Sequence, residues 1–155
     1  DVVLRELRYR WAVLPSVAQN NTVAEMWEHR PDTRDQWSHA AVSPLFLLVM
    51  DIAGIRPAEP GFRKIVVRPQ LGDLPAVELT EHTGLGPIGF RSQPEGEGHT
   101  VSLTLPADGE AELRLPSDFP TEMRRLGVIR SLGLSRYALP TGETVSFAVP
   151  GTGPA

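Results

Sequence analysis

The residues best suited to chemistry lie in one short polar stretch, residues 20–29, which reads Asn-Asn-Thr-Val-Ala-Glu-Met-Trp-Glu-His. It holds two carboxylates, Glu25 and Glu28, on either side of Trp27. An indole ring can stack on the apolar face of a pyranose sugar. A neighbouring carboxylate can take a proton from water or stabilise an oxocarbenium-like transition state. The combination predicts a carbohydrate-processing site.

A purely structural interpretation of the same residues stands beside this one. Trp27 would then be a core anchor, Glu28 a solvated turn residue and His39 a residue that holds a loop at the start of a helix. Short acidic and aromatic clusters are common in proteins without a sugar site, so spacing alone does not decide. Glu25 precedes Glu28 by three residues, so on a helical turn both would share a face and either could be the functional carboxylate.

Two apolar segments flank this stretch and must position it. A helix over residues 1–14, ended by Pro15, is predicted from the helical spacing of Leu4, Leu7, Trp11 and Leu14. A second helix is predicted from Pro44 to Ala53, with Ser43 as its N-cap and apolar residues on every side. Such a helix must be surrounded by protein. Because residue 1 already lies inside a helical pattern, we expect the chain to be a C-terminal fragment of a longer protein.

The sequence pattern changes over Gly54–Gly61, where a glycine followed by prolines is typical of a helix end. Beyond Phe62 the apolar residues alternate with a period of two. Strands are predicted at residues 62–68, 77–80, 101–105, 111–115 and 145–149. Hairpin connections are predicted at residues 84–87 and 93–98. The predicted fold is α+β, a short all-α N-terminal segment followed by an antiparallel β-sandwich.

Composition excludes several classes of partner and cofactor. The net charge is −4 with both signs interspersed, which disfavours binding to nucleic acid. The apolar run at residues 44–53 is too short to cross a bilayer, so we expect no membrane role. His82 and His99 lie far from any carboxylate cluster with ligand spacing, so we expect no metal and no cofactor. The absence of cysteine fits a cytoplasmic location, which we expect, and equally a secreted bacterial enzyme.

A set of short strings resembles, in order and spacing, the end of the catalytic domain of bacterial α-L-rhamnosidases, an inverting glycoside hydrolase family. The strings are Arg10-Trp11, Asn21-Thr22, Met26-Trp27-Glu28, Ser38-His39-Ala40, Asp51-Ile52-Ala53-Gly54-Ile55-Arg56-Pro57 and Glu59-Pro60-Gly61-Phe62. The resemblance covers roughly residues 11–69. It implies that residues 1–57 are the last helices of an (α/α)6 catalytic barrel. Residues 58–155 are then a C-terminal β-sandwich accessory domain.

The resemblance also implies roles for individual residues. Glu28 matches the carboxylate that acts as general base, and Trp27 and His39 match residues that line the pocket of the terminal sugar. The substrate would be a rhamnose-containing glycoside. The general acid lies far upstream in this family, in the missing N-terminal barrel, so we expect the fragment alone to be inactive. We expect the fragment to associate, either as a homodimer or with the rest of the barrel.

A hypothesis from another class makes the chain a non-catalytic carbohydrate-binding or structural β-sandwich module. Such a module would bind sugars through exposed aromatic residues on the sandwich. The candidates are Phe90, Phe119, Tyr137 and Phe147. Alternation along the strands predicts that Phe90 and Phe147 lie in the core, which leaves few aromatic residues for this function.

Overall fold

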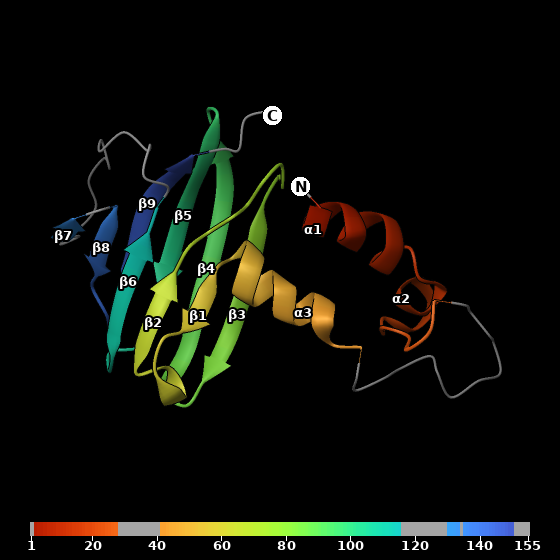
Figure 1. Ribbon diagram of the computed structural model, residues 1–155, viewed down its shortest axis with the longest axis horizontal. Coiled ribbons are helices and arrows are strands. Elements are labelled where there is room, and N and C mark those ends of the chain that lie inside the picture. The colour runs from red at the N-terminus through yellow and green to blue at the C-terminus, as the bar shows by residue number, and fades with distance from the viewer. Residues whose placement is uncertain (1, 28–40, 116–129, 134, 151–155) are drawn as a thin grey trace. The chain divides into compact units, whose positions relative to one another are not determined.

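The chain divides into two compact units, Asp1–Leu48 and Val49–Ala155, called here the N-terminal unit and the C-terminal unit. The structure, a computed structural model, describes residues 2–27, 41–115, 130–133 and 135–150. The α-helices belong to the N-terminal unit and the described strands to the C-terminal unit (Figure 1). The predicted α+β class and the order of helices before strands are therefore confirmed. The assignment of residues 1–57 and 58–155 to two domains stays a prediction.

The first predicted helix is present but interrupted. It consists of α1 (Val2–Glu6) followed by a π-helical turn, η1 (Leu7–Trp11). Leu4 and Leu14 of the predicted apolar stripe are buried, with 2% and 5% of their surface exposed. Pro15 is also the first residue of α2 (Pro15–Asn20), a helix that the sequence pattern did not predict. Proline is tolerated in the first turn of a helix because its missing N–H has no partner there.

The apolar helix predicted from Pro44 begins one residue earlier, as α3 (Ser43–Leu47). A π-helical turn, η3 (Leu48–Ile52), comes next in the sequence. Leu45 and Phe46 of α3 are 60% and 58% exposed. Among the described residues, the exposed large hydrophobic side chains all lie in the N-terminal unit and are Val2, Tyr9, Val13, Met26, Trp27, Val42, Leu45 and Phe46. The N-terminal unit therefore leaves much apolar surface uncovered.

Backbone hydrogen bonds tie the start of the C-terminal unit, around Gly54, to the residues that follow the second strand of this unit. The carbonyl oxygen of Gly54 accepts a hydrogen bond of 2.9 Å from the backbone N–H of Arg68, and that of Ile52 accepts one of 2.9 Å from Gln70. Gly54 has a φ of +71°, and a Cβ atom at this position would overlap the carbonyl oxygen of Arg68. Only glycine fits both the left-handed backbone and this close approach.

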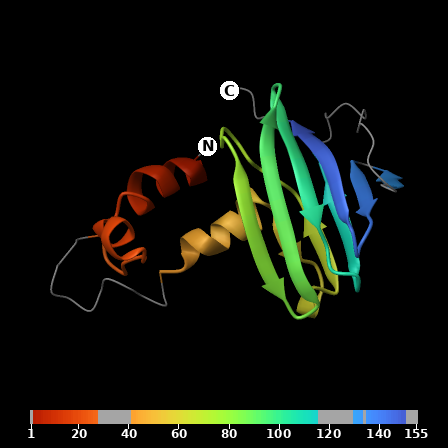
Figure 2. The ribbon, with the colours of Figure 1, turned by 180° about the vertical axis from the view of Figure 1, so that it is seen from behind.

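The C-terminal unit is a sandwich of two sheets. The first has the strand order β1-β2-β6-β8-β7 and the second the order β3-β4-β5-β9. The strands of the first sheet are β1 (Ile55–Pro57), β2 (Lys64–Val67), β6 (Glu110–Arg114), β8 (Arg136–Leu139) and β7 (Arg130–Gly133), with the 3-10 turn η4 (Pro60–Phe62) between β1 and β2. Those of the second are β3 (Val77–Thr83), β4 (Gly86–Glu95), β5 (Gly98–Thr104) and β9 (Thr144–Pro150). Figures 1 and 2 show the two sheets as two layers seen from opposite sides.

The core of the sandwich lies between these sheets. Its fully buried side chains include Ile65, Val67 and Leu113 from the first sheet and Ile88, Phe90, Val101 and Leu103 from the second. In β4 the buried Ile88 and Phe90 alternate with more exposed residues, whereas in β2 Ile65, Val66 and Val67 are all buried. Burial of these apolar side chains is the main source of stability of such a sandwich.

The strands predicted by alternation are all present as β2, β3, β5, β6 and β9. Both predicted hairpin connections are also confirmed, because β3 pairs antiparallel with β4 and β4 with β5. The prediction of a wholly antiparallel sandwich is wrong at one pair, since β2 and β6 run parallel. The reason is topological: between β2 and β6 the chain forms β3, β4 and β5 in the other sheet and then returns in the direction of β2.

Candidate functional site

The stretch predicted to carry chemistry begins where α2 ends. Asn21 caps α2 with a left-handed backbone, φ +52° and ψ +40°, and residues 22–27 follow without helix or strand. The side chain of Ser16, fully buried in α2, holds this segment. Its Oγ accepts a hydrogen bond of 3.0 Å from the backbone N–H of Ala24. The Ser16 carbonyl oxygen accepts a second, of 3.4 Å, from the hydroxyl of Thr22. The segment is thus anchored on α2.

Trp27 is held by two consecutive residues of η1. The rings of Trp11 and Trp27 have centroids 4.7 Å apart at an interplanar angle of 67°, an edge-to-face contact. The Cζ atom of Arg10 lies over the Trp27 ring, 4.3 Å from its centroid, which is cation–π geometry. Glu6, one turn earlier, accepts a hydrogen bond of 3.2 Å from Arg10 Nη1. Trp27 remains 48% exposed.

A pocket of about 210 Å³ lies beside these rings in the N-terminal unit. Its lining residues are Trp11, Ala24, Glu25, Trp27, Ala41 and Ser43. The volume is below the roughly 300–1,000 Å³ of sites for drug-sized ligands, which suits a small molecule such as one sugar ring. Two indoles offer apolar surface to such a ring, while Glu25 and Ser43 offer a carboxylate and a hydroxyl. This arrangement can bind a polar ligand that has one apolar face.

The predicted site residues are only partly brought together by the described structure. Trp27 lines the pocket, as does Glu25, which the sequence left as an alternative to Glu28. Glu28 and His39 lie outside the described residues, so their roles stay predictions. Trp11 and Ser43 were assigned to helix packing and helix initiation, and their place in the pocket was missed. The one available signal for Trp11 was its position in the Arg10-Trp11 string.

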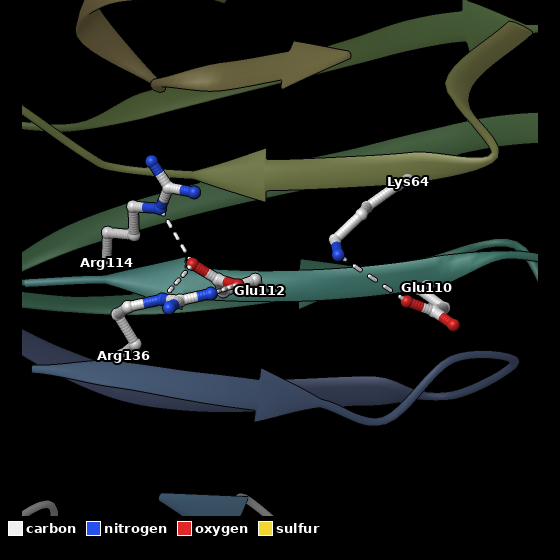
Figure 3. A network of polar contacts seen from close by, with 5 residues as sticks. All are labelled: Lys64, Glu110, Glu112, Arg114 and Arg136. Carbon is white, nitrogen blue, oxygen red and sulfur yellow. Dashed lines mark hydrogen bonds and ion pairs between the residues drawn. The ribbon is translucent and has the colours of Figure 1, made fainter. Parts of the chain in front are cut away.

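A second polar cluster lies on β6 and β8 in the C-terminal unit (Figure 3). Glu112, only 3% exposed, accepts hydrogen bonds from Arg136 Nη2 at 2.6 Å, Arg136 Nε at 2.8 Å and Arg114 Nε at 2.7 Å. The hydrogen bonds from Arg136, more than those from Arg114, lower the pKa of Glu112 to about 2. Next to this group, Nζ of Lys64 on β2 lies 3.8 Å from the carboxylate of Glu110, which is on β6 like Glu112. Glu112 is therefore ionised at neutral pH and ties strands together rather than exchanging protons.

The expected absence of a metal and of a cofactor stays a prediction. In the described ranges no group of three His, Asp or Glu residues is arranged to hold a metal ion. His82 on β3 is exposed and His99 on β5 is 5% exposed. The described helices include none of the length and apolar character that crossing a membrane requires.

Comparisons with known proteins converge on one family. The family model described as the bacterial alpha-L-rhamnosidase C-terminal domain matches residues 54–129. A curated relative, the alpha-L-rhamnosidase of Streptomyces avermitilis, is 31% identical over 75 residues, which make up 48% of this chain and 7% of that protein. The chain therefore spans less than a tenth of the length of this relative.

Solved structures show the same fold. The alpha-L-rhamnosidase of Streptomyces avermitilis complexed with L-rhamnose matches with a TM-score of 0.58 at 24% identity, over 81% of this chain and 13% of that one. The alpha-L-rhamnosidase of Dictyoglumus thermophilum matches with a TM-score of 0.57 at 22% identity, over 82% of this chain and 16% of that one. At these identities the likeness establishes the fold alone.

Proposed function

Because residues 54–129 belong to the C-terminal domain family of bacterial α-L-rhamnosidases, we propose that the chain is the C-terminal part of a glycoside hydrolase that removes terminal α-L-rhamnose from glycosides or oligosaccharides. The family match is the observation that carries this proposal. The small share of the relatives that the chain spans, 7% and 13%, supports a longer parent protein. Activity is expected only in that parent.

The N-terminal unit is, in this proposal, the last part of an (α/α)6 catalytic barrel. Its support is the uncovered apolar surface, which includes Leu45 and Phe46 on α3. Side chains of this size are seldom left to solvent in contiguous patches, and further barrel helices would cover them. The pocket beside Trp11 and Trp27 would then hold the terminal sugar, with His39 as a further contact.

The proposed reaction inverts the anomeric carbon. A carboxylate of residues 25–28 takes a proton from water, the water oxygen bonds to the anomeric carbon, and the bond to the leaving-group oxygen breaks as that oxygen receives a proton from a general acid. In inverting enzymes the two carboxyl groups are roughly 6.5–9.5 Å apart. The general acid belongs to the part of the parent outside this chain, so the fragment alone does not complete the pair.

Two carboxylates compete for the role of general base. The resemblance of Met26-Trp27-Glu28 to the family motif supports Glu28. A specific observation favours Glu25 as a second candidate, because Glu25 lines the pocket together with both indoles. The two candidates are three residues apart, so a register difference between this segment and the family motif would exchange their roles.

The rival function, a non-catalytic carbohydrate-binding module, finds little support in the sandwich. Phe90, Phe147 and Tyr137 are only 2%, 3% and 8% exposed and belong to its core. Phe119 lies outside the described residues. The described sandwich therefore offers no exposed aromatic platform from these candidates, whereas the N-terminal unit offers Trp27.

The parent protein, incubated with an aryl α-L-rhamnoside and followed by proton NMR, tests the proposal. Cleavage with β-L-rhamnose as the first product is expected, because a single displacement inverts the anomeric centre. An aryl β-D-glucoside serves as the control and should remain intact. Release of the α-anomer first would contradict inversion, and failure to cleave any aryl glycoside would contradict the enzyme function. Cleavage of a different glycoside would support the proposed reaction but show that the sugar is not rhamnose.

A further inference from the structure

We infer that Arg10 is a positioning residue that holds Trp27 in place as a wall of the sugar pocket. The inference rests on the proposed function and adds a residue to that site. Its evidence is the guanidinium carbon of Arg10, 4.3 Å from the centroid of the Trp27 ring. The described residues that line the pocket do not include Arg10, so its effect on a ligand passes through the indole.

Trp27 needs such support because of where it lies. It belongs to a segment without helix or strand, and almost half of its surface is exposed. An indole in this setting can adopt several rotamers. Rotamers that do not form the pocket wall reduce the affinity for the sugar, because they must be given up on binding. Arg10 and Trp11 are consecutive residues of η1, so the guanidinium and the second indole hold the Trp27 ring from a single turn.

Glu6 completes the arrangement by fixing Arg10. Its Oε2 atom lies 3.2 Å from Arg10 Nη1, one helical turn away, with the two side chains 40% and 53% exposed. A pair this exposed contributes little to stability. It does orient the guanidinium, because a long arginine side chain loses rotamer freedom when its tip is bound. The chain of contacts Glu6, Arg10, Trp27 thus leads from a regular helix to an irregular loop at the pocket.

The test is a double-mutant cycle in the intact parent protein, with KM and kcat on an aryl α-L-rhamnoside as readouts. Arg10→Met should raise KM roughly two- to fivefold, the range that a cation–π contact at an exposed site corresponds to, with kcat nearly unchanged. Arg10→Lys, which keeps the cation, should restore part of the loss. Arg5→Met, an exposed arginine of the same helical segment, is the matched control and should keep the wild-type KM.

The cycle separates this inference from the function on which it rests. Trp27→Ala should raise KM more than Arg10→Met does, and Arg10→Met should add nothing in the Trp27→Ala background. An additive effect, or a wild-type KM in Arg10→Met, would overturn the positioning role while the sugar site stands. An unchanged KM in Trp27→Ala would show that Trp27 does not contact the substrate. The positioning role of Arg10 would then also be refuted. A parent that cleaves no aryl glycoside would refute the function and therefore the inference as well.

Discussion

Glu112 is buried beneath two half-exposed arginines, Arg114 and Arg136, which bind its carboxylate. Replacing it with Gln removes the charge but keeps the shape, so the guanidiniums of Arg136 and Arg114 lose their charge-assisted partner. We expect Glu112→Gln to lower the free energy of unfolding by about 1–3 kcal/mol. Urea unfolding at pH 7 measures the loss. Glu110→Gln is the matched control on the same strand. Glu110 is 78% exposed and its single ion pair, with Lys64, is long at 3.8 Å, so this substitution should change the free energy of unfolding little.

The same carboxylate predicts a pH dependence. Its pKa in the folded protein, about 2, lies below the ordinary value of 4.5, so the unfolded chain binds the proton more readily. The stabilisation from Glu112 is therefore complete above about pH 4.5 and is lost as the pH falls towards 2. The difference in unfolding free energy between wild type and Glu112→Gln should shrink over this window. A difference that stays constant from pH 7 to pH 3 would contradict the assignment.

At the level of single residues, the sequence pattern pointed to Trp27 as a sugar-binding residue and to Glu28 as the base, with Glu25 as the alternative. Trp27 and Glu25 line the described pocket, whereas Glu28 and His39 lie outside the described residues, so these roles stay predictions. The contact of Arg10 with Trp27 was not predictable, since it joins a helix to a loop across seventeen positions of sequence. Glu112 was also missed. Alternation predicts an exposed carboxylate between Ala111 and Leu113, but all three are buried in β6.

Among the elements, the turn at Gly54 is the one that a single methyl group should disrupt. Gly54→Ala places a Cβ against the carbonyl oxygen of Arg68 and strains a backbone with φ +71°. Gly61→Ala is a matched control, because Gly61 has φ +70° but no atom within 4 Å of such a Cβ. The control should cost about 1–2 kcal/mol of unfolding free energy from backbone strain alone. Gly54→Ala should cost clearly more, and equal losses in thermal or urea unfolding would refute the steric argument.

Elements with a clean apolar period were predicted, and elements with mixed signals were not. β5 and β9 alternate plainly between buried and more exposed residues, so their faces follow from sequence. β4 carries Pro87, Pro94 and Gly89, which read as breakers although they lie inside one long strand. The parallel pairing of β2 with β6 could not be predicted, because it depends on the excursion of the chain through the other sheet rather than on local residues.

For the whole molecule, the uncovered apolar surface of the N-terminal unit predicts association. Leu45 and Phe46 contribute to this surface as consecutive large side chains, each more than half exposed. We expect the isolated chain to form dimers or larger species and to bind a hydrophobic dye. Light scattering over a range of concentrations measures the first effect. The double variant Leu45→Ser and Phe46→Ser should reduce both signals, and a wild-type chain that stays monomeric without dye binding would contradict the prediction.

We propose that residues 25–28 of this chain supply the general base of an α-L-rhamnosidase. The most direct test is kcat of the intact parent and its Glu28→Gln and Glu25→Gln variants on an aryl α-L-rhamnoside, with Asp32→Asn as a control from the same part of the sequence. Glutamine cannot accept a proton from water, and loss of a general base typically costs about 10²–10⁴ in rate. We predict a loss of this size in Glu28→Gln, or in Glu25→Gln if the pocket-lining carboxylate is the base, with Asp32→Asn close to wild type. Near-normal kcat in both glutamine variants would show that neither carboxylate is the general base.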